Sequence, residues 1–383
     1  MLFIIFFNAL FQLLGEPQPK FKEQVVDNNI WIGYGMAVGD VDGDDKPDIL
    51  LADKKQFVWY RNGDWKRFVM IDNLTQHDNV CIAAKDIDGD GKVEVAVGAQ
   101  WNPSETGNEQ QSGAVFFLIR PDDPTQLWTA KELHHEVTTH RMKWIKSAEG
   151  KYYLVVAPLH GKDNKNGEGA GVKILAYAFP EEVNSEWKIV PLDTTLHLTH
   201  NFDIVTGGKS RGIYVASREG VKFISDKFSS SQNVSSQNIP GIDKGAGEIK
   251  VGKAGKEKNF IATVEPMHGT AIVVYLKDDN ARRIVLDDNV KEGHALAVAD
   301  FTGSGRDQVV AGWRAANKDG KVGVKIYTML DAKGEKWDTE WIDENGMACE
   351  DIQVADLNGD GKPDIVASGR ATKNLKIYWN NGK

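Results

Sequence analysis

One phrase recurs along the chain: a few small apolar residues, a turn rich in Asp and Gly, and then a run of β-branched residues. Such periodicity is the signature of a repeat architecture, and the mean spacing of about 53 residues is in the range of a propeller blade. Four copies are strong, at residues 37–53, 83–99, 297–313 and 353–369. Three are weaker, at residues 143–158, 203–217 and 248–266.

Each repeat carries four strand-like runs, of which the recurring phrase supplies the first two. The third run lies at residues 57–60, 114–118, 172–175, 324–327 and 375–379. The fourth, often opened by Trp, lies at residues 65–71, 128–133, 187–192, 282–286 and 337–342. Many short strands joined by turns also suit a chain with 38 Gly. The sequence therefore predicts an all-β fold, a seven-bladed β-propeller.

The two ends of the chain indicate how the ring closes. The last repeat reaches Lys383 after its third strand, and residues 21–28 (FKEQVVDN) resemble the fourth strand at residues 65–73 (WKRFVMIDN). We therefore expect the N-terminal strand to complete the last blade. Residues 20–383 would then form a single propeller domain.

The first residues form a separate segment. Residues 1–14 (MLFIIFFNALFQLL) are almost wholly apolar and have the length of a signal-peptide core, although no Lys or Arg precedes them. We expect a signal peptide at residues 1–16 and a secreted or periplasmic protein; a misplaced start or a buried segment is the alternative. No apolar run reaches the roughly 18 residues that a membrane span requires.

The charge and the cysteine count exclude several classes of protein. The net charge is −9, which argues against nucleic acid and anionic membranes as partners. Two Cys in 383 residues exclude a disulfide-stapled scaffold and a Cys-based zinc finger. Cys81 and Cys349 fall in blades two and seven, so we expect both to be unpaired core residues near the channel.

The strongest turns resemble calcium loops. Carboxylate or amide residues stand at alternating positions around a Gly and return after the turn, as calcium, a cation that takes six to eight oxygen ligands, prefers. The expected calcium ligands are Asp40, Asp42, Asp44 and Asp48; Asp86, Asp88, Asp90 and Glu94; and Asp356, Asn358, Asp360 and Asp364. A hydrogen-bonded Asx turn without metal is the alternative. The sixth loop (Asp300, Thr302, Ser304, Asp307) is depleted, so we expect it to hold no ion.

All nine histidines map to the face opposite these turns. In a propeller the first strand of each blade lines the channel, so residues that precede it or follow the second strand share one face. His77, His134, His135, His140, His197, His200 and His294 precede or open a first strand, and His160 and His268 follow a second strand. This one-sided distribution predicts a functional site at one mouth of the channel.

Chemistry suggests a role for each part of this set. Neutral imidazoles from neighbouring blades can bind zinc or another divalent transition metal, and we expect His200, His268 and His294 to do so, with Glu265 as a fourth candidate. An imidazole near a carboxylate can act as a general base, and His140 is the first choice for it. The expected catalytic residues are His140, Arg141, His160 and Glu350. The expected substrate-binding residues are His77, Asp78, Trp101, His135, Trp313, Arg314 and Arg370.

The chain also resembles known families. Its repeats are similar to the FG-GAP or VCBS-type propeller repeats of extracellular proteins, a match that is specific for fold. The intervening segments resemble the propeller domain of the aldos-2-ulose dehydratase family. They are residues 134–136 (HHE), 140–142 (HRM), 199–202 (THNF), 265–269 (EPMHG), 292–296 (EGHAL), 347–351 (MACED) and 369–372 (GRAT). This resemblance implies a carbon–oxygen lyase that dehydrates keto-sugars such as 1,5-anhydrofructose or glucosone, or acts on keto-glycosides, at a metal site in the propeller.

The partner would then be a small keto-sugar or an oligosaccharide. Two alternatives remain open. The first is a non-catalytic, calcium-stabilised extracellular propeller that binds carbohydrate or protein; it predicts no clustering of His at one channel mouth. The second is a polysaccharide lyase acting on uronate polymers, which needs a long basic groove that a net charge of −9 does not favour.

Overall fold

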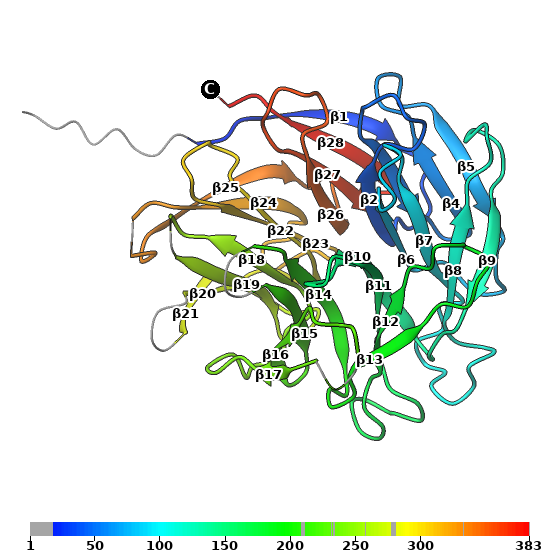
Figure 1. The fold of residues 1–383 in the computed structure, drawn as a ribbon. Coiled ribbons are helices and arrows are strands. Elements are labelled where there is room, and N and C mark those ends of the chain that lie inside the picture. Colours follow the sequence, from blue (N-terminus) through cyan, green and yellow to red (C-terminus); the bar gives the residue numbers. More distant parts are fainter. Residues whose placement is uncertain are drawn as a thin grey trace, which may run out of the picture.

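The computed structural model describes residues 18–207, 211–230, 232, 234–256, 258–276, 281–331 and 333–382. The expected signal peptide, residues 1–16, lies outside the described residues. Within the described residues the structure has 28 strands, arranged in seven four-stranded antiparallel sheets. The inner strands surround a central channel and the outer strands lie at the rim (Figure 1). The predicted all-β, seven-bladed propeller is confirmed.

The first four blades follow the chain in order, each running from the inner to the outer strand. Blade 1 contains β2 (Gly35–Gly39), β3 (Asp48–Ala52), β4 (Gln56–Tyr60) and β5 (Arg67–Asp72). Blade 2 contains β6 (Cys81–Lys85), β7 (Glu94–Ala99), β8 (Ala114–Ile119) and β9 (Thr129–Leu133). Blade 3 contains β10 (Thr139–Lys146), β11 (Tyr152–Pro158), β12 (Ile174–Ala178) and β13 (Ile189–Asp193). Blade 4 contains β14 (Thr199–Val205), β15 (Gly212–Ser217), β16 (Gly220–Ser225) and β17 (Ser236–Asn238).

The remaining blades complete the ring. Blade 5 contains β18 (Ile249–Lys253), β19 (Asn259–Glu265), β20 (Ala271–Leu276) and β21 (Arg282–Asp287). Blade 6 contains β22 (Gly293–Ala299), β23 (Gln308–Trp313), β24 (Gly323–Met329) and β25 (Trp337–Glu344). Blade 7 contains β26 (Cys349–Ala355), β27 (Asp364–Gly369), β28 (Asn374–Asn380) and β1 (Phe21–Asp27).

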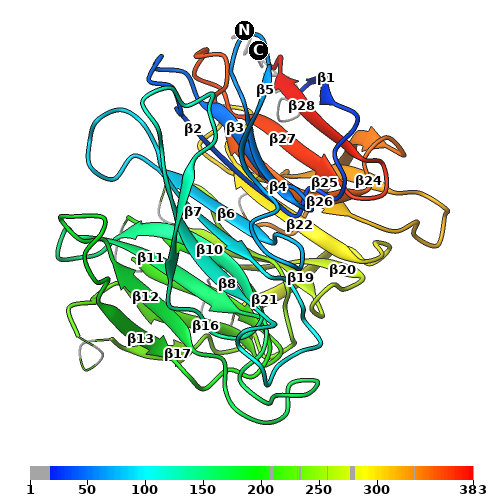
Figure 2. The ribbon, with the colours of Figure 1, turned by 90° about the vertical axis from the view of Figure 1, so that its right-hand side faces the viewer.

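The N-terminal strand closes the ring as the sequence predicts. β1 pairs antiparallel with β28, from Phe21 opposite Asn380 to Asp27 opposite Leu375. The two strands run side by side in both views (Figures 1 and 2). Ring closure covers the apolar sheet face that an open array of blades would expose at each end.

The hydrophobic core lies between neighbouring sheets. One cluster joins Leu50 and Trp59 of blade 1 to Val97 and Phe116 of blade 2, and similar clusters recur around the ring. Because the second strands are covered on both faces, they are near-continuous apolar runs rather than alternating ones. Both cysteines are buried and free, as expected.

Buried carboxylates near the ends of outer strands tie blade 6 to blade 7 and blade 5 to blade 6. Asp343, near the end of β25, accepts hydrogen bonds from Lys376 Nζ at 2.8 Å and from Tyr378 OH at 2.7 Å, both on β28 of the following blade. Asp287 bonds Lys325 and Tyr327 in the same way. Within the part of the chain that the structure describes, no helix is long and apolar enough to cross a membrane.

Candidate functional site

β-Bulges at the start of the inner strands supply much of the candidate site. The pairing register shifts by one residue at Thr139/Arg141 in β10, at Gly293/Ala295 in β22 and at Cys349/Asp351 in β26, so that the extra residues are His140, His294 and Glu350. A shift in β14 spans the position of His200. A bulge re-aims a side chain that the regular pleat would direct elsewhere.

Three of the imidazoles are oriented by the backbone of the next inner strand. Nδ1 of His140 lies 2.9 Å from the carbonyl oxygen of His200, and Nδ1 of His200 lies 3.1 Å from that of Gly247. Nδ1 of His294 lies 2.6 Å from the carbonyl oxygen of Glu350. Because a carbonyl can only accept, each Nδ1 carries the proton and each Nε2 keeps a lone pair. This orientation is the one that metal-binding histidines require.

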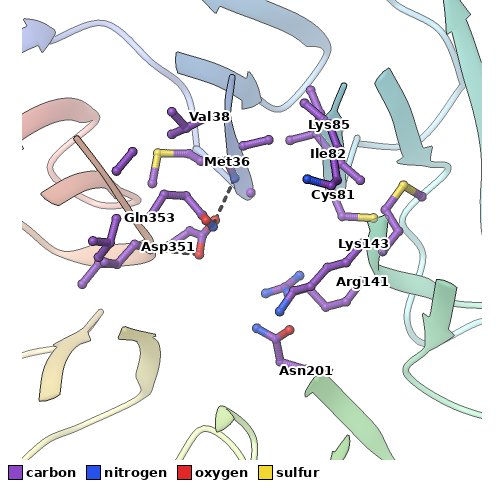
Figure 3. Close-up of a pocket in the computed structure, with 18 of the residues that line it drawn as sticks. Met36, Val38, Cys81, Ile82, Lys85, Arg141, Lys143, Asn201, Asp351 and Gln353 are labelled. Carbon is purple, nitrogen blue, oxygen red and sulfur yellow. Dashed lines mark hydrogen bonds between the residues drawn. The ribbon is translucent and has the colours of Figure 1, made fainter. Parts of the chain in front are cut away.

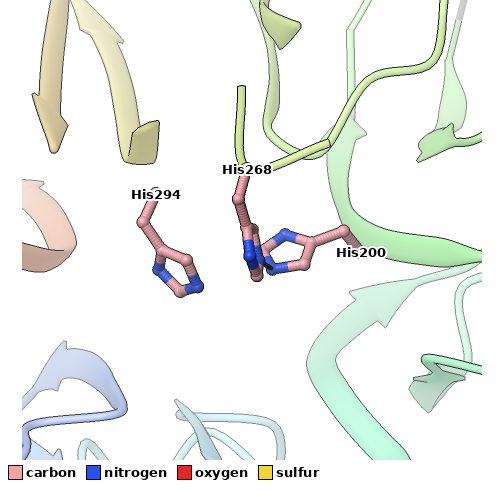
Figure 4. Close-up of side chains that lie close together, drawn as sticks. All are labelled: His200, His268 and His294. Atoms are coloured by element: carbon pink, nitrogen blue, oxygen red, sulfur yellow. Dashed lines mark hydrogen bonds between the residues drawn. The ribbon is translucent and has the colours of Figure 1, made fainter. Parts of the chain in front are cut away.

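His200, His268 and His294 converge at the channel mouth (Figure 4). One ring nitrogen from each lies within 4.8 Å of the others, and Nε2 of His268 is 2.5 Å from Nε2 of His200. Burial lowers the pKa of all three; the pKa of His268 falls to about 2, with His200 and Arg314 adding to the effect of burial. The three rings are therefore neutral near pH 7, the form that binds zinc.

His140 stands beside this cluster as a fourth imidazole. Its ring centroid lies 4.6 Å from that of His200, and Trp101 stacks on it at 4.9 Å with an interplanar angle of 26°. Nη1 of Arg141 donates to Nε2 at 3.1 Å. Burial and then the Arg141 charge lower the pKa of His140, so the ring is neutral near pH 7 and its Nε2 accepts the Arg141 hydrogen bond.

Two buried glutamates flank the imidazoles. Glu350 accepts from Arg314 Nη1 at 3.3 Å and from Arg370 Nη1 at 3.1 Å, yet burial raises the pKa of its carboxyl. Glu248 lies just before β18; its Oε1 is 2.9 Å from His200 Nδ1 and its Oε2 accepts from Asn201 at 2.6 Å. Burial also raises the pKa of Glu248.

The channel continues beneath the histidines as a cavity of about 440 Å³. Arg141, Asn201, Glu248 and Asp351 line its upper end, and Arg141 and Asp351 face each other across it (Figure 3). Asp351 is fixed by the backbone N–H of Met36 at 2.7 Å. The polar upper end thus gives way to a channel lined by the inner strands.

Two expected site residues lie elsewhere. Glu265 is the last residue of β19, and its carboxylate accepts from Tyr275 OH at 2.6 Å and from Arg283 Nη2 at 2.7 Å, away from the three histidines. Trp313 is fully buried in the core between blades 5 and 6, where it packs on Trp341. Both predictions are wrong for the same reason: each residue is at the correct end of a second strand, but its side chain lies against the outer strands of its own blade rather than toward the channel.

The remaining expected residues lie around the mouth. Asp78 accepts a hydrogen bond from Tyr34 OH at 3.1 Å, and its backbone pairs with that of Trp101 in an isolated β-bridge. The half-buried His77 donates its backbone N–H to the side-chain oxygen of Gln100. The guanidinium of Arg370 lies 5.4 Å above the Tyr34 ring.

Two further expected histidines stand apart from the cluster. Among the described contacts, the backbone N–H of His160 donates to Thr138 Oγ1, and its backbone pairs with that of Leu198 in an isolated β-bridge. Neither contact joins His160 to the three histidines. Nδ1 of His135 is buried without a hydrogen bond.

Sequence reasoning missed Tyr34 in the site. The available signal was its place directly before an inner strand, the position that supplies the histidines.

The Asp-rich turns lie on the opposite face. Asp40, Asp42 and Asp48 bring carboxylate oxygens within 4.8 Å of one another, as do Asp86, Asp88 and Asp90. In every strong turn the first Asp also caps backbone N–H groups, as Asp356 does for Gly359 and Gly361. The calcium-ligand and Asx-turn interpretations are thus compatible in the first two turns. For all twelve expected ligands, calcium binding stays a prediction.

The family comparisons support the sequence resemblance. Residues 112–278 match the family model described as "Aldos-2-ulose dehydratase, beta-propeller domain". That resemblance is confirmed. Residues 40–97 and 300–367 match the FG-GAP-like repeat. The aldos-2-ulose dehydratase match contains His140 and His200 and ends before His294.

Curated relatives act on carbohydrates according to their names. Aldos-2-ulose dehydratase of Phanerodontia chrysosporium is 24% identical over 372 residues, covering 88% of this chain and 40% of the relative. Rhamnogalacturonan endolyase YesW of Bacillus subtilis (strain 168) is 24% identical over 312 residues, covering 77% of this chain and 46% of the relative. The chain thus spans less than half the length of these relatives.

Solved structures agree on the fold. BBS1N in complex with ARL6DN, from crystals soaked with mercury, superposes with a TM-score of 0.56 at 12% identity, covering 94% of this chain and 96% of that one. The lead-soaked crystals give a TM-score of 0.55, also at 12% identity, covering 96% and 97%. At this identity the likeness concerns the propeller fold alone.

Proposed function

We propose that this protein is a metal-dependent carbohydrate lyase that performs β-elimination on a keto-sugar at the channel mouth. The observation that carries the proposal is the convergence of His200, His268 and His294 beside a fourth imidazole, His140. Three neutral imidazoles, of which His200 and His294 are oriented by backbone carbonyls, form a donor set suited to zinc or another divalent transition metal. His140 then serves as the base.

The chain's own residues account for the proton transfers. A C–H next to a ketone is acidic enough for His140 Nε2 to take its proton. The electron pair left on carbon moves toward the carbonyl oxygen, whose developing negative charge Arg141 can stabilise. Glu350, with its raised pKa, donates a proton to the departing oxygen on the neighbouring carbon. When bound, the metal ion supplies a Lewis acid that polarises the carbonyl.

The leaving group decides the type of reaction. Expulsion of a hydroxyl as water makes a dehydratase of 1,5-anhydrofructose or glucosone, and expulsion of a sugar makes a lyase of keto-glycosides. A uronate polysaccharide lyase is the second candidate, because Arg141, Arg314 and Arg370 surround the mouth and a rhamnogalacturonan endolyase is among the relatives. We further propose that calcium binds the Asp-rich turns and that the protein acts in the periplasm or outside the cell.

The reaction is tested with purified protein loaded with zinc and mixed with 1,5-anhydrofructose, glucosone or a 3-keto-glucoside. We expect a new ultraviolet absorbance from the enone product. His140→Gln should lower kcat by about 10²–10⁴-fold, the usual contribution of a general base. His197→Gln is the matched control, because His197 pairs with Glu219 on the same face. Equal rates for the two variants, or no enone from any of these sugars, would overturn the proposal.

A further inference from the structure

The longest connections on the mouth face form a wall over two neighbouring blades. The wall consists of residues 100–113 of blade 2 and residues 159–173 of blade 3, which connect second to third strands. The two loops are linked, because Asp163 N–H donates to the carbonyl of Thr106 at 2.8 Å and Lys162 pairs with Glu109 at 3.0 Å. A substrate longer than one sugar therefore meets a continuous barrier over blades 2 and 3.

The mouth is open beside this wall, over blades 1 and 7, the first of which packs directly against blade 2. The corresponding connections are residues 370–373 in blade 7 and residues 53–55 in blade 1. Between these blades runs the connection from β1 to β2, residues 28–34, which lies on the same face because β2 starts there. This connection carries Trp31, whose side chain is 66% exposed. An exposed Trp at the open side of a site is an unusual use of the largest apolar side chain.

The backbone around Trp31 is held in place by a buried carboxylate. Asp53 is 3% exposed and accepts from the backbone N–H groups of Trp31 at 2.8 Å, Ile32 at 2.8 Å and Gly33 at 3.1 Å. Ser368 Oγ donates to the carbonyl of Gly33 at 2.7 Å, which ties the connection to blade 7. The indole is thus presented on a fixed support, so little backbone freedom would be lost when a ligand stacks on it.

The same connection reaches the candidate site three residues later. Tyr34 bonds Asp78 and lies under Arg370, which itself bonds Glu350. On the outer side, the ammonium of Lys54 lies 5.5 Å from the centroid of the Trp31 ring. A row of carboxylate, cationic and aromatic side chains therefore extends from Glu350 to Trp31 along the open side of the mouth.

We propose that Trp31 forms an outer sugar subsite, which stacks on the unit joined to the reacting sugar and makes glycosides of two or more units the preferred substrates. A pyranose with equatorial substituents has a flat face of C–H groups that matches an indole, and Lys54 can donate to its hydroxyls. The identity of the reacting unit rests on the proposed function; the subsite itself rests on the Trp31 geometry.

Binding of cellobiose and of glucose, measured by calorimetry, tests this subsite without catalysis. We expect cellobiose to bind wild-type protein about tenfold more tightly than glucose, and Trp31→Ala to abolish that preference, which corresponds to the loss of one stacking contact. Trp31→Tyr should retain part of it. Leu127→Ala is the matched control, because Leu127 is 65% exposed in the connection between β8 and β9 on the opposite face.

The outcomes separate this inference from the proposed reaction. An unchanged cellobiose preference in Trp31→Ala, or no cellobiose preference in wild-type protein, would overturn the subsite, whether or not the protein eliminates. A preference that depends on Trp31 and persists in His140→Gln would support it. Were that same protein to form no enone from any keto-sugar, the proposed reaction would fail and the subsite would stand.

Discussion

Nδ1 of His294 donates to the carbonyl oxygen of Glu350, 2.6 Å away on the next blade. His140 and His200 make the same kind of contact with the following inner strand. The propeller therefore fixes the tautomer of three site histidines through backbone carbonyls, and at His200 the Oε1 of Glu248 is a second acceptor, 2.9 Å from Nδ1. Each Nε2 is left as the ring atom that can bind a metal or take a proton.

Removal of one of these rings should remove the metal. We expect His294→Ala and His200→Ala to lower zinc affinity by more than about 100-fold, beyond the effect of losing an outer hydrogen-bond partner. His197→Ala, on the same face, should keep the metal of the wild-type protein. Elemental analysis after gel filtration measures the ratio of zinc to protein. Equal zinc in His294→Ala and wild-type protein would place the metal elsewhere.

The buried tie between blades 6 and 7 should dominate the stability of the ring closure. Asp343→Ala leaves Lys376 and Tyr378 without their shared partner in a buried site, and loss of one member of such a pair costs about 3–5 kcal/mol. Glu23→Ala removes the other carboxylate of Lys376, at 3.0 Å, but Glu23 is largely exposed and its loss should cost less than about 1 kcal/mol. Urea unfolding of the two variants measures the difference. Similar losses in both would contradict the assigned role of Asp343.

The overall fold and much of the site face follow from the sequence for a physical reason. A repeat of four strands fixes which loops share a face, so the position of His200, His268 and His294 within the repeat was enough to place them together. Side-chain direction depends on finer features. Glu265 and Trp313 lie against the outer strands of their own blades, while bulges turn His140 and Glu350 toward the site. The sequence of a single repeat does not predict a bulge, because the extra residue is visible only in the pairing register of the two strands.

The Asp-rich turns predict a calcium-dependent response to pH. Burial raises the pKa of Asp48 and of Glu94 to about 7, so the native state retains protons that the unfolded chain releases near pH 4. Without calcium, the free energy of unfolding should therefore fall as the pH rises from about 4 to 7. Calcium binds the ionised carboxylates and should reverse this fall.

The melting temperature with and without a chelator, followed between pH 5 and pH 8, measures that response. Asp48→Asn is the informative variant, because it keeps an acceptor for the N–H of Val41 and removes the charge. It should flatten the pH dependence of the chelated protein and weaken the response to calcium. A calcium effect of equal size at pH 5 and pH 8 would contradict the assignment.

Lys143 should impose the opposite pH dependence from inside the channel. Its ammonium is buried, donates to the carbonyl of Phe202 and lies 5.0 Å from that ring; burial and then Lys250 lower its pKa to about 7. Between pH 7 and pH 10 the unfolded chain holds a proton that the native state has released, so stability rises with pH. Lys143→Met removes this contribution, whereas Lys22→Met on the exposed outer strand should not. The free energy of unfolding of wild type, relative to that of Lys143→Met, should increase by on the order of 3 kcal/mol from pH 7 to pH 10. Parallel stability curves in urea would show that Lys143 keeps its proton in the native channel.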